Sequence, residues 1–388
     1  AFGAEVRTKD GSATENTVLM EGGTVTNNLY GAALTDANAT GNATNNTVTL
    51  KGGTINGHVY GGFTRGTGKT TGNTVNLGDG SGPISATVHG TLYGGSDADT
   101  TGNTLNVNDK GGKAGSVKGF STIRFKLGSN VGNGDTVLTL TEDTTIDYNT
   151  IVRPEVDNWL GEEMERTAHL IGMQGGKTLT LNGYVSGTGI KRGGDVEYAL
   201  KTDTDTMSTT GSLDLNAYKW QHANVMISRA LANVFGGKAL YAPNGETRNN
   251  KLTLNNGADV MTATGGDTKT ANGTAEKNSL TINEGAKVNA QAIGGKAQGG
   301  DAKENTALLA GGTVHTLKGG QSVNGNAKGN MVTLTKGTVT DAFGGDAGTT
   351  AVKNRLILNG SAQAATLTGG RGKAVNENHI EITGGTVN

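Results

Sequence analysis

Residues 61–70, "GGFTRGTGKT", come nearest in this chain to a motif with chemistry of its own. The run Gly68-Lys69-Thr70 resembles the end of a phosphate-binding loop, which needs another glycine five residues earlier. The chain has Phe63 at that position. The motif also needs a helix after it, whereas this segment lies between two copies of an extended repeat. We therefore expect no nucleotide cofactor.

The histidines do not form a metal-ligand pattern. Glu165 and His169 stand four residues apart, as two ligands on one helix face would, but a metal site needs a third ligand. A surface ion pair is the simpler interpretation of this spacing. We expect no metal and no other cofactor, because the six histidines are scattered at His58, His89, His169, His222, His315 and His379.

Carboxylates leave one enzymatic alternative open, a β-helix enzyme that cleaves polysaccharides. Such enzymes place two carboxylates within about 10 Å of each other. In the regular copies of the repeat, the outward strand positions are mostly Thr, Lys, Ser, Arg or His, which gives no such pair. We expect no enzyme, although acidic residues are denser in one region, at Glu142, Asp143, Asp147, Glu155 and Asp157.

A repeat supplies the elements that must position all these residues. The segment "NTVTLKGGTINGHVYGG", residues 46–62, restates the pattern of residues 16–31. Each copy opens with Asn and an alternating strand, and a fixed period of this kind is typical of a solenoid. The opening residues are Asn16, Asn46, Asn73, Asn103, Asn224, Asn250, Asn278, Asn305, Asn330, Asn354 and Asn378.

Each copy contains three short extended stretches separated by turns. In the first stretch, alternate residues such as Val48 and Leu50 are apolar and share one face of a strand. The opposite face is polar and varies from copy to copy. A "GGTV"-like segment follows, and in most copies a Gly-Gly pair such as Gly61-Gly62 comes last.

One copy is too small to be stable by itself. A buried aliphatic side chain contributes roughly 1.5 to 3 kcal/mol, whereas ordering each residue costs about 1 kcal/mol or more. Stacking the copies about 4.8 Å apart would align their strands into parallel sheets and their apolar residues into continuous rows. We predict an all-β fold, a right-handed parallel β-helix (solenoid) of roughly ten to twelve coils.

We interpret the opening asparagines as structural corner residues. Asn tolerates the left-handed backbone of a sharp corner, and its amide can bond to the corners above and below. The Gly-Gly pair is expected at another corner with positive φ.

Composition supports a repetitive β structure and excludes some partners. The chain of 388 residues is 33% hydrophobic and 4% aromatic, with 66 glycines, 3 prolines and no cysteine. Its 33 basic and 34 acidic residues give a net charge of −1, so we expect no nucleic acid partner. No apolar run approaches the length of a membrane span, and we expect no membrane insertion of this fragment.

The tandem "NTVTLKGGTINGHVYGG" units, without cysteine and rich in Gly, Thr and Asn, resemble the passenger domain of a bacterial autotransporter, a type V secreted adhesin. The resemblance covers about residues 1–120 and 224–388. It implies an extracellular location on the bacterial cell surface, tethered to the outer membrane through a C-terminal barrel missing here. Because the chain starts and stops inside a unit, we expect the natural protein to be longer.

Three regions follow from this pattern. Residues 1–120 and 224–388 are N-terminal and C-terminal β-helix coils, and residues 121–223 are an irregular or inserted region. Within it, Pro154 and the acids after it favour a helix near residues 155–171.

The inserted region is also where we expect binding. Aromatic anchors with a charged rim are typical of recognition surfaces. The alternative for Trp159 is a structural role, in which it pins the predicted helix to the solenoid. The candidate residues are Trp159, Glu162, Glu165, Arg166 and His169. The expected function is that of a non-catalytic adhesin fragment, whose partner is a host cell-surface protein or glycan, or another copy in homotypic self-association between cells.

Overall fold

The structure, a computed structural model, describes residues 1–96, 98–147, 149–156, 159–160, 165–182, 189–193, 195–201, 208–240 and 244–388. Within these ranges the chain is all-β and forms a parallel β-solenoid of about 13 turns, close to the number of coils predicted. The predicted fold class is confirmed. The chain divides into two compact units, each described here by itself. Unit 1 is Ala1–Gly161, Arg166–Gly189 and Ala199–Asn216, and unit 2 is Glu162–Glu165, Ile190–Tyr198 and Ala217–Asn388.

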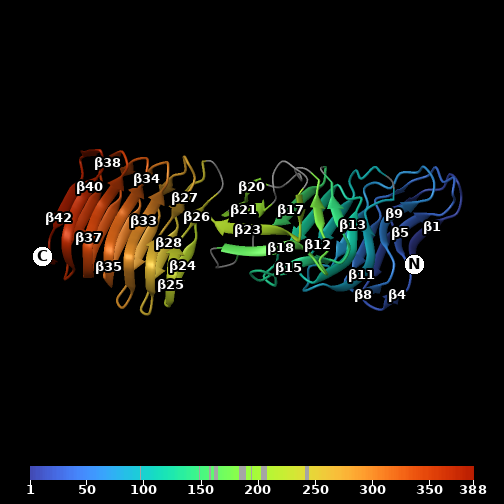
Figure 1. Ribbon diagram of the computed structural model, residues 1–388, viewed down its shortest axis with the longest axis horizontal. Coiled ribbons are helices and arrows are strands. Elements are labelled where there is room, and N and C mark those ends of the chain that lie inside the picture. The colour runs from blue at the N-terminus through green and yellow to red at the C-terminus, as the bar shows by residue number, and fades with distance from the viewer. Residues whose placement is uncertain are drawn as a thin grey trace. The chain divides into compact units, whose positions relative to one another are not determined.

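Unit 1 is built from two long parallel sheets, whose strands stack in chain order as far as β17 and β18 (Figure 1). The strands that open each turn are β3 (Thr17–Met20), β7 (Thr47–Leu50), β10 (Thr74–Leu77), β12 (Thr104–Val107), β14 (Thr122–Lys126) and β17 (Ile151–Glu155). The second sheet contains β1 (Phe2–Val6), β4 (Thr24–Val25), β5 (Leu29–Leu34), β8 (Gly52–Ile55), β9 (Val59–Thr64), β11 (Ser85–Tyr93), β13 (Gly112–Lys118), β15 (Thr136–Leu140) and β18 (Glu165–Met173).

Short strands complete the middle part of the chain and the corners of unit 1. They are β2 (Ala13–Thr14), β6 (Ala43–Thr44), β16 (Thr144–Ile146), β19 (Leu179–Leu181), β20 (Gly189–Gly193), β21 (Val196–Lys201), β22 (Ser208–Thr210) and β23 (Ser212–Lys219).

Unit 2 repeats the same turn with greater regularity. Its opening strands are β24 (Asn224–Ile227), β28 (Lys251–Leu254), β32 (Ser279–Ile282), β35 (Thr306–Ser322), β37 (Met331–Ala347), β39 (Arg355–Leu358) and β42 (His379–Ile382). The other sides are formed by β25 (Ala230–Phe235), β26 (Lys238–Ala239), β27 (Thr247–Arg248), β29 (Asp259–Thr264), β30 (Asp267–Thr268), β31 (Ala275–Glu276), β33 (Lys287–Ala297), β34 (Ala302–Lys303), β36 (Ala327–Lys328), β38 (Thr350–Val352), β40 (Gln363–Arg371), β41 (Ala374–Asn376) and β43 (Thr386–Val387).

The parallel register places equivalent residues of successive turns in line, which forms the core. In unit 2, Leu254 pairs with Ile282, and Leu334 pairs with Leu358. These side chains are fully buried, as the alternating pattern predicts. Ile382 is 58% exposed because β42 has a neighbouring opening strand on one side only. Each row therefore depends on the turns above and below it.

The corner asparagines form a buried ladder of hydrogen bonds. Asn305 donates both its backbone N–H and its Nδ2 to Oδ1 of Asn330, each at 3.0 Å. The Nδ2 also donates to the carbonyl of Ala275 at 2.8 Å. The same pattern links Asn16, Asn46, Asn73 and Asn103 in unit 1, and Asn250, Asn278, Asn305, Asn330, Asn354 and Asn378 in unit 2.

Two details of this corner differ from the prediction. The left-handed backbone belongs to the residue before each Asn, as at Asn249 and Glu304, with φ of 54° and 52°. The Asn itself is thus free to direct its amide along the stack. Asn224 pairs with Lys251, one position past the corner, and Ala223 donates to Asn250 in its place. Asn224 therefore does not join the ladder.

The Gly-Gly pairs are needed for space, and the expectation of positive φ at these pairs was wrong. A Cβ on Gly295 would collide with the side chain of Asn305, and a Cβ on Gly294 would collide with the carbonyl oxygen of Gly319. The pair lets the backbone approach the next turn and leaves a niche for the corner amide.

The predicted helix near residues 155–171 is wrong over its described part. Pro154 and Glu155 end strand β17, and Glu165–Met173 form strand β18. β18 pairs with β15, so that Ile171 lies beside Leu138. This parallel neighbour supplies hydrogen bonds along the strand, which outweigh the local helix signals. Residues 157–158 and 161–164 of the predicted helix lie outside the described residues.

Candidate binding surface

Four aromatic rings stack along one face of unit 1. Phe2, Tyr30, Tyr60 and Tyr93 occupy the same position on successive turns. Their ring centroids are 4.9, 5.1 and 4.6 Å apart, and adjacent rings are within 9° of parallel. We call this set the aromatic ladder.

Neighbouring side chains hold the aromatic ladder in place. Phe63 contacts Tyr60 edge-on at 5.1 Å, and His58 contacts Tyr93 edge-on at 5.7 Å. Nδ1 of His58 accepts the backbone N–H of Thr91 at 2.9 Å, which leaves the proton of a neutral imidazole on Nε2. The aromatic ladder is therefore rigid, because each of its rings packs against a fixed neighbour.

The three tyrosines of the aromatic ladder are half-buried, and Phe2 at its end is 47% exposed. The rings cover each other's faces, and the Tyr30 hydroxyl accepts a hydrogen bond from Nδ2 of Asn28 at 2.8 Å. Burial raises the pKa of Tyr60 to about 12, and the neighbouring Tyr93 and Tyr30 add to the effect. The Tyr60 hydroxyl therefore keeps its proton near neutral pH, where it can donate a hydrogen bond to a ligand.

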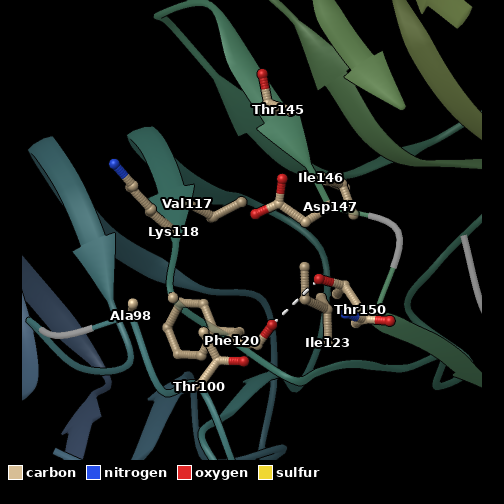
Figure 2. A pocket seen from close by; sticks show the side chains of 12 residues that line it. Ala98, Thr100, Val117, Lys118, Phe120, Ile123, Thr145, Ile146, Asp147 and Thr150 are labelled. Atoms are coloured by element: carbon tan, nitrogen blue, oxygen red, sulfur yellow. Dashed lines mark hydrogen bonds between the residues drawn. The ribbon is translucent and has the colours of Figure 1, made fainter. Parts of the chain in front are cut away.

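Unit 1 also contains a pocket of about 240 Å³, shown in Figure 2. Lys118 pairs with Tyr93 and continues the row of the ladder by one turn. The pocket is lined by Ala98, Thr100, Val117, Lys118, Gly119, Phe120, Ile123, Thr145, Ile146, Asp147, Asn149 and Thr150.

The pocket combines an apolar base with an exposed polar rim. Phe120 and Ile123 are buried, and the hydroxyl of Thr150 donates to the carbonyl of Phe120 at 3.2 Å. Lys118 and Asp147 are exposed, and neither forms an ion pair with any residue that the structure describes. Both charges are thus available to a ligand.

The structure does not gather the predicted binding residues into one exposed site. Trp159 is fully buried, and its Nε1 donates to the carbonyl of Val131 at 2.8 Å. Arg166 donates to the carbonyl of Trp159 at 2.7 Å. The indole therefore packs inside unit 1, where a partner cannot reach it.

The other predicted residues have separate partners. Nδ1 of His169 lies 2.6 Å from the Asp214 carboxylate, and Nζ of Lys238 lies 3.1 Å from the Glu165 carboxylate. Glu162 lies outside the described residues.

In unit 2, the residues before the Gly-Gly pairs form no continuous aromatic row, because Phe343 has Lys318 and Thr368 as its neighbours on the adjacent turns. The Asp346 carboxylate lies 2.8 Å from Nζ of Lys318 and 2.8 Å from the guanidinium of Arg371. Burial acts to raise the pKa of Asp346, but the hydrogen bonds from Arg371 and Lys318 outweigh burial and lower it below 3.8. The same corner thus carries a different surface in each unit.

Sequence reasoning missed the aromatic ladder, although its signal was present. An aromatic residue precedes the glycine at Tyr30, Tyr60 and Tyr93, and turns spaced by about 4.8 Å must bring such residues into stacking distance. The pocket has no comparable signal, because its lining comes from loops and strands far apart in the sequence.

Comparison with known proteins gives no relative: no protein-family model, curated protein or solved structure matches the chain. Over its described ranges, the chain has no group of three or more His, Asp or Glu side chains placed to hold a metal ion. In the same ranges, we find no helix with the length and hydropathy needed to cross a bilayer.

Proposed function

We propose that this chain is part of a non-catalytic adhesin of the bacterial cell surface, of the autotransporter passenger type, and that the aromatic ladder of unit 1 is its binding surface. The ligand is a glycan or protein of a host cell. The solenoid holds the ladder on a rigid support, which lowers the entropy lost on binding.

The concentration of aromatic residues on one strip is the observation that carries this proposal. The chain has only 2 Trp, 8 Tyr and 6 Phe, yet the ladder and Phe63 bring five aromatic rings together. Tyrosine is enriched at interfaces because it combines a large apolar ring with a hydroxyl and few rotatable bonds.

The pocket chemistry supports a binding role over polysaccharide cleavage. Glycoside hydrolysis needs a pair of carboxylates on either side of the bond that breaks. Asp147 is the one carboxylate among the described residues that line the pocket. A single carboxylate can accept hydrogen bonds from a sugar but cannot supply both the acid and the base.

Binding of the full chain to epithelial cells and to a glycan array tests the proposal. We expect Tyr93→Ala, at the end of the ladder beside the pocket, to reduce attachment about tenfold or more, because truncating an aromatic residue that anchors an interface often costs over 1 kcal/mol of binding free energy. Tyr60→Phe keeps the stack and removes one hydroxyl, so it should have a smaller effect.

Thr104→Ala is the matched control, since Thr104 lies in β12 on the other sheet of the same unit. It should leave attachment unchanged. Equal attachment by the Tyr93→Ala variant, folded as judged by circular dichroism, would show that the ladder is not the binding surface.

A further inference from the structure

We propose that the pocket beside the aromatic ladder binds one sugar unit that carries an anionic group, as part of a longer glycan. This inference rests on the proposed function and specifies its ligand. The ladder and the pocket then form one surface, since Lys118 lines the pocket and is the register partner of Tyr93 on the next turn.

The size of the pocket favours a single sugar ring. Its volume of about 240 Å³ is just below the range typical of pockets for drug-sized ligands. Residues from three segments of unit 1 line it, at positions 98–100, 117–123 and 145–150. A longer chain would have to leave the pocket, and the ladder lies on one side of it.

The two unpaired charges favour one orientation of a ligand in the pocket. Lys118 and Asp147 carry opposite charges, and in the view of Figure 2 the side chain of Val117 lies between them. An anionic substituent would pair with the Lys118 ammonium, whereas hydroxyl groups would donate to the Asp147 carboxylate. A ligand with a negative group at one end and hydroxyls at the other satisfies both.

The remaining lining matches the rest of a sugar ring. The Thr100 hydroxyl and the Asn149 amide can exchange hydrogen bonds with sugar hydroxyls. Phe120 and Ile123 form an apolar base for the C–H groups of the ring. Apolar side chains combined with a small number of precisely placed polar groups are typical of small-molecule sites.

Ligand-observed NMR on the full chain tests the inference with three probes: glucuronic acid, N-acetylglucosamine 6-sulfate and neutral N-acetylglucosamine. We expect both acidic sugars to bind, and the neutral sugar to bind at least about tenfold more weakly. Comparing the two acidic probes tells a carboxylate from a sulfate ligand. Affinity for the acidic sugars should fall as the salt concentration rises.

Substitutions then assign the contacts. Lys118→Gln should weaken the acidic sugars about tenfold or more, whereas Asp147→Asn should weaken all the sugars that bind. Lys113→Gln is the control, because Lys113 is also exposed on β13 but does not line the pocket.

The outcomes separate this inference from the proposed function. The inference fails if no probe binds, or if the Lys118→Gln variant binds acidic sugars as the parent does. The effect of Tyr93→Ala on cell attachment then still decides the proposed function. If acidic sugars and glycans that contain them bind through Lys118 but the chain attaches to no host cell, the inference stands and the adhesin proposal fails.

Discussion

The corner asparagine shows how a single residue type serves a solenoid at the residue scale. Its backbone donates along the stack, and its amide satisfies two neighbouring turns. The buried Asn305 accepts from the N–H and the Nδ2 of Asn278, at 3.0 Å each. A buried polar group is stable when all its hydrogen bonds are made, and the repeating ladder provides them on both sides.

We expect Asn305→Ala to lower the unfolding free energy by about 3 kcal/mol, since two buried donors of Asn278 lose their acceptor at roughly 1 to 3 kcal/mol each. Adding Asn330→Ala should lower it further without reducing attachment to the ligand. Thermal denaturation measures the first effect and cell attachment the second. Asn324→Ala, in an exposed loop, is the control. If the double variant is stable but no longer attaches, the corner asparagines themselves have a role in binding.

Gly295→Ala tests the space requirement of the Gly-Gly pair. The added Cβ would collide with the side chain of Asn305, so we expect the melting temperature to fall by several degrees. Gly22→Ala is the matched control, because a Cβ there meets no atom within 4 Å. Calorimetry compares the two variants. If both variants melt alike, space for the Asn305 side chain does not explain the glycine at position 295.

At the scale of elements, each strand is defined by its neighbours as much as by its own residues. The opening strands alternate between a buried and a solvated face, and this alternation fixes the inward rows. Strand β18 carries helix signals but extends because β15 lies beside it with open hydrogen-bonding groups. Tertiary pairing thus overrides a weak local preference.

Leu334→Asp should unfold the turns around β37, because an unpaired carboxylate in the core costs several kcal/mol. Leu254→Asp should do the same around β28. Thr333→Asp serves as the control, since Thr333 directly precedes Leu334 on the same strand but faces outward. Circular dichroism and thermal denaturation of the three variants check the register. An unchanged melting temperature for either leucine variant would show that the assigned faces are wrong.

The Asp346 network should make unit 2 sensitive to acid. Its folded pKa lies below the unfolded value, so its contribution to stability is full above about pH 4 and is lost as the pH falls through the folded pKa. We expect the melting temperature to drop below pH 4, and Asp346→Asn to flatten that drop. Glu377→Gln, in an exposed ion pair with Lys353, should change little. A parallel decline for Asp346→Asn and parent would contradict this assignment.

At the scale of the whole molecule, a solenoid couples each turn mainly to its neighbours. Both units follow this rule, since their rows, corner ladders and aromatic or ionic side chains all run between adjacent turns. Function can therefore differ along the chain while the turn stays the same. Unit 1 carries the aromatic ladder and the pocket, and unit 2 carries the buried ion pair of Lys318 and Asp346 beside its Gly-Gly pairs.

Hydrogen exchange should reveal this local coupling. In the Asn305→Ala variant, we expect faster amide exchange in β32, β35 and β37, which contain or adjoin the altered corner, and unchanged exchange in β7, β10 and β12 of unit 1. Mass spectrometry of the exchanged peptides measures both regions at once. Faster exchange throughout the chain would indicate that the solenoid unfolds as one cooperative body.

The sequence by itself determined the structure of one turn of the solenoid. The alternation of residues such as Val48 and Leu50 marked the buried face, and the period of the asparagines marked the corners, because both signals are local and repeat in every copy. The stacking needed to bury them followed from the small size of one copy.

Only the tertiary structure decided how neighbouring turns fit together. The left-handed residue precedes the Asn, the Gly-Gly pair makes room for its amide, and β18 is extended, because each of these depends on atoms of an adjacent turn. Trp159 lies in the interior, whereas Tyr30, Tyr60 and Tyr93 form the surface strip. Whether a side chain is buried or stacked depends on which residues of the adjacent turns lie beside it. In the irregular turns, the spacing of residues along the sequence does not show which residues these are.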